Sequence, residues 1–137
     1  MNKPFSLSKN ERIKSKKTIE TLFQQGEAFF SYPYRLVFIL HREAKQPSLN
    51  MAISVPKRFF KRAHDRNRIK RLARETYRLQ KTALHTLVMQ HQCELNLMLI
   101  YQGRDILDYN VMYKQMNSCL QQLSERIFPM PKQQNNA

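Results

Sequence analysis

The chain of 137 residues carries 24 Lys and Arg side chains against 10 Asp and Glu, a formal net charge of +14. This length suits one domain with its own core, and a hydrophobic content of 42% is too high for a disordered chain. With only two glycines, Gly26 and Gly103, the sequence excludes the glycine-clustered loops that bind dinucleotides or nucleoside triphosphates.

Targeting and cysteine patterns predict a soluble protein of the cytoplasm with no membrane association. Residues 1–17 are charged but lack the apolar stretch of a signal peptide. The longest apolar runs, 36–40 and 97–101, reach about a quarter of the ~20 residues that span a bilayer. Cys93 and Cys119 lack the spacing of a metal site, so we expect two buried free thiols.

The positive charge is concentrated in two segments. Residues 57–81 hold 11 Lys and Arg against 2 acids, and residues 1–17 hold 6 against 1. Residues 94–137 are balanced, with 4 basic and 4 acidic side chains. A charge that served solubility alone would be spread evenly, so this distribution predicts one side that faces a polyanion.

The first half of the chain predicts a short helix and two strands. Residues 1–7 form a loose tail, and Ser15 is suited to cap a helix that Gly26 ends. A buried strand follows at 34–40, and a strand with alternating apolar residues at 49–55. The short connection between these two strands predicts that they pair as a hairpin.

The second half predicts a helix, a strand and a helix. An amphipathic helix of about five turns runs from Asp65 through Leu84. Residues 94–101 are apolar on both faces, as in a central strand, and Asp108 caps a last helix that reaches residue 127. Residues 129–137 form a polar, disordered tail. We therefore predict an α+β fold in which three helices pack on a small sheet.

The polar face of the 65–84 helix is almost wholly basic. Its members are Asn67, Lys70, Arg71, Arg74, Arg78 and Lys81. A solvated face would mix charges of both signs, and a membrane-surface helix would carry bulky apolar residues opposite the charges. Here Ala73 and Thr76 suit packing on a sheet, and Arg outnumbers Lys by seven to four in residues 57–81. The pattern favours binding to nucleic-acid phosphates.

No set of side chains predicts catalysis by the protein. The four histidines are scattered, and His91 with Cys93 lacks two further metal ligands. Aromatic residues are dense at 29–38, and an exposed few would stack on unpaired bases. Phe23 and Phe38 are candidates to line one groove. The basic helix together with an aromatic-bearing sheet favours RNA or single strands as the ligand.

The segment "RNRIKRLARE" at 66–75, preceded by "ISVPKR" at 53–58, resembles the signature of the bacterial ribonuclease P protein subunit. The likeness extends over about residues 8–127, and we expect residues 8–128 to form the single domain of the chain. It implies a fold like the second domain of ribosomal protein S5, with a mixed sheet and a left-handed β-α-β crossover. That crossover is an exception to the usual right-handed rule.

The resemblance also implies a function. The protein would bind the catalytic RNA of ribonuclease P and the 5′ leader of precursor tRNA. We expect a monomer within the holoenzyme. Chemistry would belong to the RNA and its Mg²⁺, with no protein catalytic residue and no metal held by the protein alone.

Site residues follow from the same resemblance. Ile19, Phe23 and Phe38 are the leader-cleft candidates, and the turn Phe59–Arg62 receives no role. The residues expected to contact the catalytic RNA are Lys57, Arg58, Arg66, Asn67, Arg68, Lys70, Arg71 and Arg74. Two alternatives remain open on composition: a structural RNA-binding protein of the ribosomal type, and a basic membrane-surface module.

Overall fold

The computed structural model of the protein describes residues 12–13 and 15–129. Within this part, four helices and four strands follow one another along the chain. They are α1 (Lys16–Gln25), β1 (Glu27–Ser31), β2 (Tyr34–His41), β3 (Ser48–Ser54), α2 (Ala63–Gln80), α3 (Thr82–Gln90), β4 (Glu94–Tyr101) and α4 (Tyr109–Ile127). The strands form one mixed sheet in the order β1-β2-β4-β3. The predicted α+β class and small mixed sheet are confirmed.

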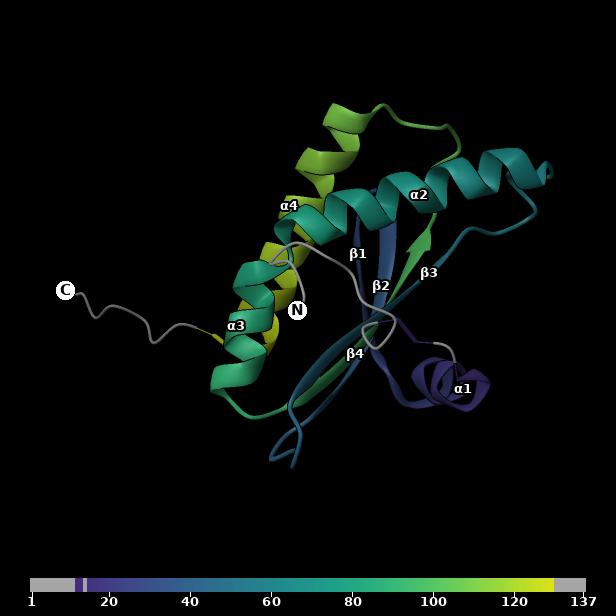
Figure 1. Cartoon of the computed structure of the whole chain (residues 1–137). Coiled ribbons are helices and arrows are strands. Elements are labelled where there is room, and N and C mark those ends of the chain that lie inside the picture. The colour runs from purple at the N-terminus through teal and green to yellow at the C-terminus, as the bar shows by residue number, and fades with distance from the viewer. Residues whose placement is uncertain (1–11, 14, 130–137) are drawn as a thin grey trace, which may run out of the picture.

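The helices cover the two faces of the sheet unequally. Figure 1 shows α2, α3 and α4 together on one side and α1 by itself on the other. A large cluster of buried side chains joins the three helices to the sheet, and it includes Phe38, Leu97 and Tyr77. A small cluster under α1 has only Leu22, Val37 and Met98 as fully buried members. The core therefore lies on the three-helix face.

The predicted hairpin between the strands at 34–40 and 49–55 is wrong. Strand β4 lies between them, antiparallel to β2 and parallel to β3. The hairpin of this sheet joins β1 to β2 instead, and β1 was missed in the sequence. Because β4 is apolar on both faces, burial is greatest when it takes the central position, as predicted. The parallel pair β3 and β4 is the pair whose connection, through α2 and α3, the resemblance implies to be left-handed.

The predicted helix ends agree with the structure in three places. The hydroxyl of Ser15 accepts a hydrogen bond from the backbone N–H of Thr18, and the carboxylate of Asp108 accepts one from the N–H of Val111. Gly26 ends α1 and donates its N–H to the carbonyl of Leu22. A Cβ at Gly26 would lie 2.4 Å from that carbonyl oxygen, which explains why glycine stands there.

The helix predicted from Asp65 through Leu84 is two helices. Helix α2 ends at Gln80, and α3 begins at Thr82, so four helices rather than three pack on the sheet in the described part of the chain. No Gly or Pro marks this break. Lys81 at the junction is buried, with 4% of its surface exposed, and it does not belong to the basic face.

The structure tests the predictions about the cysteines but leaves those about the tails and the domain bounds untested. Cys93 and Cys119 are free and buried as predicted, and burial raises the pKa of both thiols, that of Cys119 to about 12. In the part of the chain that the structure describes, no helix is long and apolar enough to cross a membrane. The predicted tails, 1–7 and 129–137, lie outside the described residues except for Pro129. The domain bounds 8–128 stay a prediction.

Candidate nucleic-acid interface

The apolar side of α2 fixes where its basic side points. Ile69, Ala73, Thr76 and Tyr77 are buried against the sheet and α4. Because these positions recur at helical spacing, the residues between them face outward. Asn67, Arg68, Arg71 and Arg74 are exposed, and Lys70 is half-buried. The basic face predicted from the sequence is therefore present at the surface over the first three turns of the helix.

Acidic side chains neutralise only the two ends of this face. Asp65 lies 3.9 Å from Arg62, and Glu75 accepts hydrogen bonds from Arg78, the shorter of 2.6 Å. The hydrogen bond from Arg78 holds the pKa of Glu75 below its ordinary value. Within residues 12–13 and 15–129, no ion pair joins Arg68, Lys70, Arg71 or Arg74 to a carboxylate. These four cations remain available for an external anion.

Arg66 has an internal role that the sequence did not indicate. Its Nη1 donates to the backbone carbonyl oxygens of Phe60 and Lys61, at 2.8 and 2.9 Å. These bonds fix the turn between β3 and α2. Part of the guanidinium is thus occupied by the protein itself, and its contact with RNA stays a prediction.

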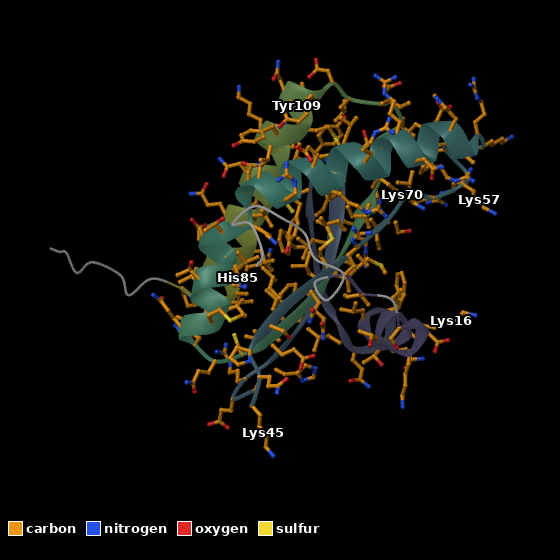
Figure 2. All side chains as sticks on the ribbon, in the orientation of Figure 1. Lys16, Lys45, Lys57, Lys70, His85 and Tyr109 are labelled. Carbon is orange, nitrogen blue, oxygen red and sulfur yellow. The ribbon has the colours of Figure 1, made fainter. Side chains whose placement is uncertain are left out.

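A groove of about 500 Å³ lies at the β3 edge, between α1 and α2. Its lining comprises Arg12, Ile13, Ile19, Phe23, Met51, Ala52, Ile53, Ser54, Val55, Lys70, Arg74 and Met98. The floor is apolar, and the three cationic side chains come from the N-terminal segment and α2. Figure 2 shows Lys70 on the side of α2 that faces α1. The groove brings two of the leader-cleft candidates, Ile19 and Phe23, together with two of the predicted RNA contacts.

The N-terminal segment contributes a residue that the sequence did not single out. The N–H of Ile13 donates to the carbonyl of Met51 at 2.9 Å, so residues 12–13 run beside the edge strand β3. This contact places Arg12 at the groove. The basic composition of residues 1–17 was the signal for it, although the pairing with β3 has no signature in the sequence.

Phe38 does not line this groove, and the expectation that it shares one with Phe23 is wrong. Its side chain is 3% exposed and packs edge-to-face on Phe29, with ring centroids 6.3 Å apart, in the cluster under α2, α3 and α4. Successive residues of a strand point to opposite faces. The neighbour that faces α1 is Val37, which packs with Leu22.

An aromatic residue and a cation lie side by side on the face that α1 leaves uncovered. Arg35 is two residues from Val37 and so shares its face, and its partner across the β1–β2 pair is Phe30. Phe30 is 57% exposed, close to the 59% of Phe23. The uncovered face therefore continues beyond the groove with groups that suit bases and phosphates.

The acidic side chains of α2 are paired with basic ones. Asp65 lies beside Arg62, and Glu75 accepts hydrogen bonds from Arg78. In the residues that the structure describes, no group of three His, Cys, Asp or Glu side chains is placed to hold an ion. The exposed donors of this surface suit phosphates, and the expectation that the protein alone holds no Mg²⁺ stays a prediction.

Known proteins resemble the chain in sequence and in fold. The family model described as Ribonuclease P matches residues 7–124. The ribonuclease P protein component of Porphyromonas gingivalis is 36% identical over 116 residues, 85% of each chain. The fold is similar to that of a Staphylococcus aureus RNase P protein mutant, with a TM-score of 0.66 over 85% of this chain and 90% of that one at 20% identity. The Thermotoga maritima RNase P protein gives a TM-score of 0.63 over 82% and 96% of the chains at 18% identity. The extent of these matches shows that the chain belongs to the ribonuclease P protein component family.

Proposed function

We propose that this protein binds the catalytic RNA of ribonuclease P through the basic face of α2 and holds the 5′ leader of precursor tRNA in the groove. Its family supplies the protein component of ribonuclease P, a ribonucleoprotein of tRNA processing. The observation that carries the proposal is the convergence of two surfaces: Lys70 and Arg74 belong both to the uncompensated face of α2 and to the groove.

The basic face suits a folded RNA because its donors are arginines on a rigid helix. A guanidinium offers forked N–H donors that match phosphate oxygens, and α2 presents Arg68, Arg71 and Arg74 without competing carboxylates. Two polyanions repel each other when they approach. The protein would reduce this repulsion by placing positive charge between the catalytic RNA and its substrate.

The groove suits a single strand because it combines an apolar floor with a cationic rim. The exposed ring of Phe23 offers a surface on which a base stacks, and Arg12, Lys70 and Arg74 are placed for the backbone phosphates. Ile19, at the same wall, offers apolar contact and no stacking. Only an unpaired base can stack on an exposed ring, so the unpaired leader is the ligand that suits this groove.

The remaining roles belong to the partner RNA in this proposal. The catalytic RNA would hold the Mg²⁺ ions and cleave the leader, with one copy of the protein in a cytoplasmic holoenzyme. The protein would supply binding and orientation and no catalytic residue.

The test is 5′-leader cleavage by the organism's catalytic RNA at limiting Mg²⁺, with and without the protein. We expect the full chain to stimulate cleavage and the double variant Arg68→Ala/Arg71→Ala to lose most of this effect. In parallel, the slope of log affinity against log salt should flatten by about 0.7–0.9 for each lost phosphate contact. The variant should fold, because both side chains are exposed.

Other outcomes separate the alternatives. Tight RNA binding without stimulation would indicate a structural RNA-binding protein of the ribosomal type. Binding to anionic vesicles but not to RNA at physiological salt would indicate a membrane-surface module. An unchanged affinity and salt slope in the double variant would contradict the assignment of α2.

A further inference from the structure

A cluster outside the groove joins two arginines that are far apart in the sequence. The guanidinium carbon of Arg58 lies 4.8 Å from the ring centroid of Phe59, and that of Arg104 lies 4.1 Å from the same centroid. Arg58 and Phe59 belong to the turn before α2, and Arg104 to the loop after β4. Arg104 comes from the third of the chain whose net charge is balanced, so no pattern in the sequence indicated that it lies beside the basic segment.

Both segments of the cluster are held in place by contacts below it. On one side, Arg66 binds the carbonyl oxygens of Phe60 and Lys61. The buried ring of Phe60 packs on Tyr101, with centroids 6.0 Å apart. On the other side, the hydroxyl of Tyr101 donates to the carbonyl of Asp105 at 2.6 Å. The turn and the loop are therefore fixed against each other through Phe60 and Tyr101.

Gly103 allows the loop to approach this closely. A Cβ at this position would lie 2.9 Å from the hydroxyl oxygen of Tyr101. The backbone can therefore pass against the Tyr101 ring only with glycine next to Arg104. The backbone position of Arg104 therefore follows from packing.

The cluster lacks a negative partner. Arg58 and Arg104 are exposed, and in the described ranges 12–13 and 15–129 neither forms an ion pair with a carboxylate. A contact between a guanidinium and an aromatic face is only weakly stabilising at an exposed site. Two like charges near one ring repel each other, and phosphates bound at these guanidinium groups would reduce this repulsion.

We propose that Arg58, Phe59 and Arg104 form a phosphate-binding site for an RNA backbone, with the ring of Phe59 holding the two guanidinium groups in position. The inference rests on the proposed function, because it takes RNA as the ligand of the adjoining basic face. None of the three residues lines the groove, so the site is distinct from the leader-binding surface. Figure 2 shows Lys57, next to Arg58, at the end of the molecule where α2 begins. The site therefore extends the RNA-binding surface around the N-terminus of α2.

The test measures the affinity of full-length variants for RNA at several salt concentrations. Arg104→Gln should lower affinity about fivefold to tenfold and flatten the salt slope by about 0.7–0.9, the values for one lost phosphate contact. Phe59→Leu keeps both charges, so it should lower affinity about twofold to fivefold without changing the slope. A thermal unfolding midpoint equal to that of the wild type would show that Phe59→Leu acts by positioning and not by unfolding.

A matched control is present in the chain. Arg126, on α4, lies 4.3 Å from the ring centroid of Phe29 and makes the same kind of contact away from α2. Arg126→Gln removes the same charge and should leave affinity and slope unchanged. An equal loss in Arg126→Gln and Arg104→Gln would overturn the proposal, because it would reduce the effect to net charge.

Two RNA probes identify which phosphates the site binds. One is the organism's catalytic RNA alone, and the other is a precursor tRNA with a leader added to the assembled holoenzyme. If Arg104→Gln lowers the affinity for one of the two probes, the site is supported, and that probe shows which RNA supplies the phosphates. If it lowers the affinity for neither probe, the proposal is overturned. The Arg68→Ala/Arg71→Ala variant separates the two proposals: if it loses affinity while Arg104→Gln does not, only this site fails. If neither variant loses affinity, the proposed function of α2 fails.

Discussion

The face of the sheet under α2, α3 and α4 and the face under α1 are built from the same four strands but are covered to different extents. Under the three helices, residues such as Phe38, Leu97 and Leu99 are at most 3% exposed and belong to one continuous cluster. Under α1, only Leu22, Val37 and Met98 are fully buried, and a groove opens between α1 and α2. Phe23 at this groove and Phe30 on β1, on the same side of the sheet, stay more than half exposed.

Because of this difference, one face of the sheet stabilises the fold and the other is available for binding. Burial of apolar area on the three-helix face supplies most of the hydrophobic stabilisation of a small domain. The α1 face can then leave aromatic rings in water, where they are available to bases. Substitutions on the two faces should therefore have separable effects, large on the free energy of unfolding for one face and on RNA affinity for the other.

The largest effect is expected for Phe38→Ala. Loss of a buried phenyl ring should lower the free energy of unfolding by about 3–5 kcal/mol, because the cavity beside Phe29 would not be refilled. Denaturant unfolding of the full chain measures this loss. The residual folded protein should bind a leader oligonucleotide with wild-type affinity. A variant with near-normal stability and weakened leader binding would contradict the assignment of Phe38 to the closed face.

A smaller effect, on binding alone, is expected for Phe23→Ala. The exposed ring contributes little to packing, so the free energy of unfolding should change by no more than about 0.5 kcal/mol. Loss of a stacking surface should weaken binding of a single-stranded leader by about 1–3 kcal/mol. This loss of affinity is measured by titrating the holoenzyme with precursor tRNAs of different leader lengths. Only substrates whose leader reaches the groove should be affected.

Phe30→Ala is the matched control for this prediction. Its ring is as exposed as that of Phe23 and lies on the same side of the sheet, but it does not line the groove. Affinity for short leaders should be unchanged in this variant. If Phe30→Ala weakened leader binding and Phe23→Ala did not, the leader would run along the β1 edge and not through the groove.

Local signals in the sequence predicted the parts of the molecule that depend on neighbouring residues. The caps at Ser15 and Asp108 and the stop at Gly26 are properties of one helix turn, and each was identified correctly. The basic and apolar faces of α2 follow from helical periodicity. The central place of β4 follows from its apolar residues on both faces. The order of these elements predicted the α+β class, and the family signature added the mixed sheet, which periodicity alone left open.

Features that depend on contacts between residues far apart in the chain could not be predicted from such local patterns. The order of strands places β4 between β2 and β3, and nothing in the connection at 42–47 excludes the hairpin that was predicted. The break at Lys81 has no Gly or Pro, and the apolar stripe continues across it. Assigning Phe38 to the groove required knowing which strand face α1 covers. Val37 faces α1, whereas Phe38, the next residue of the strand, faces the opposite side of the sheet.

The smallest effect is expected where the basic face meets Glu75, the acidic residue toward the C-terminal end of the same helix. Glu75 accepts hydrogen bonds from Arg78, and Glu75→Gln should raise the affinity for the catalytic RNA about twofold, since one repulsive charge is removed. Mild acid should not reproduce this gain. Arg78 holds the pKa of Glu75 below its ordinary value, so the carboxylate keeps its charge at pH values where an unpaired glutamate would begin to lose it. Glu125→Gln, an exposed acid on α4, is the control of equal charge change. If it raised affinity as much as Glu75→Gln, RNA would respond to the net charge of the whole protein and not to the face of α2.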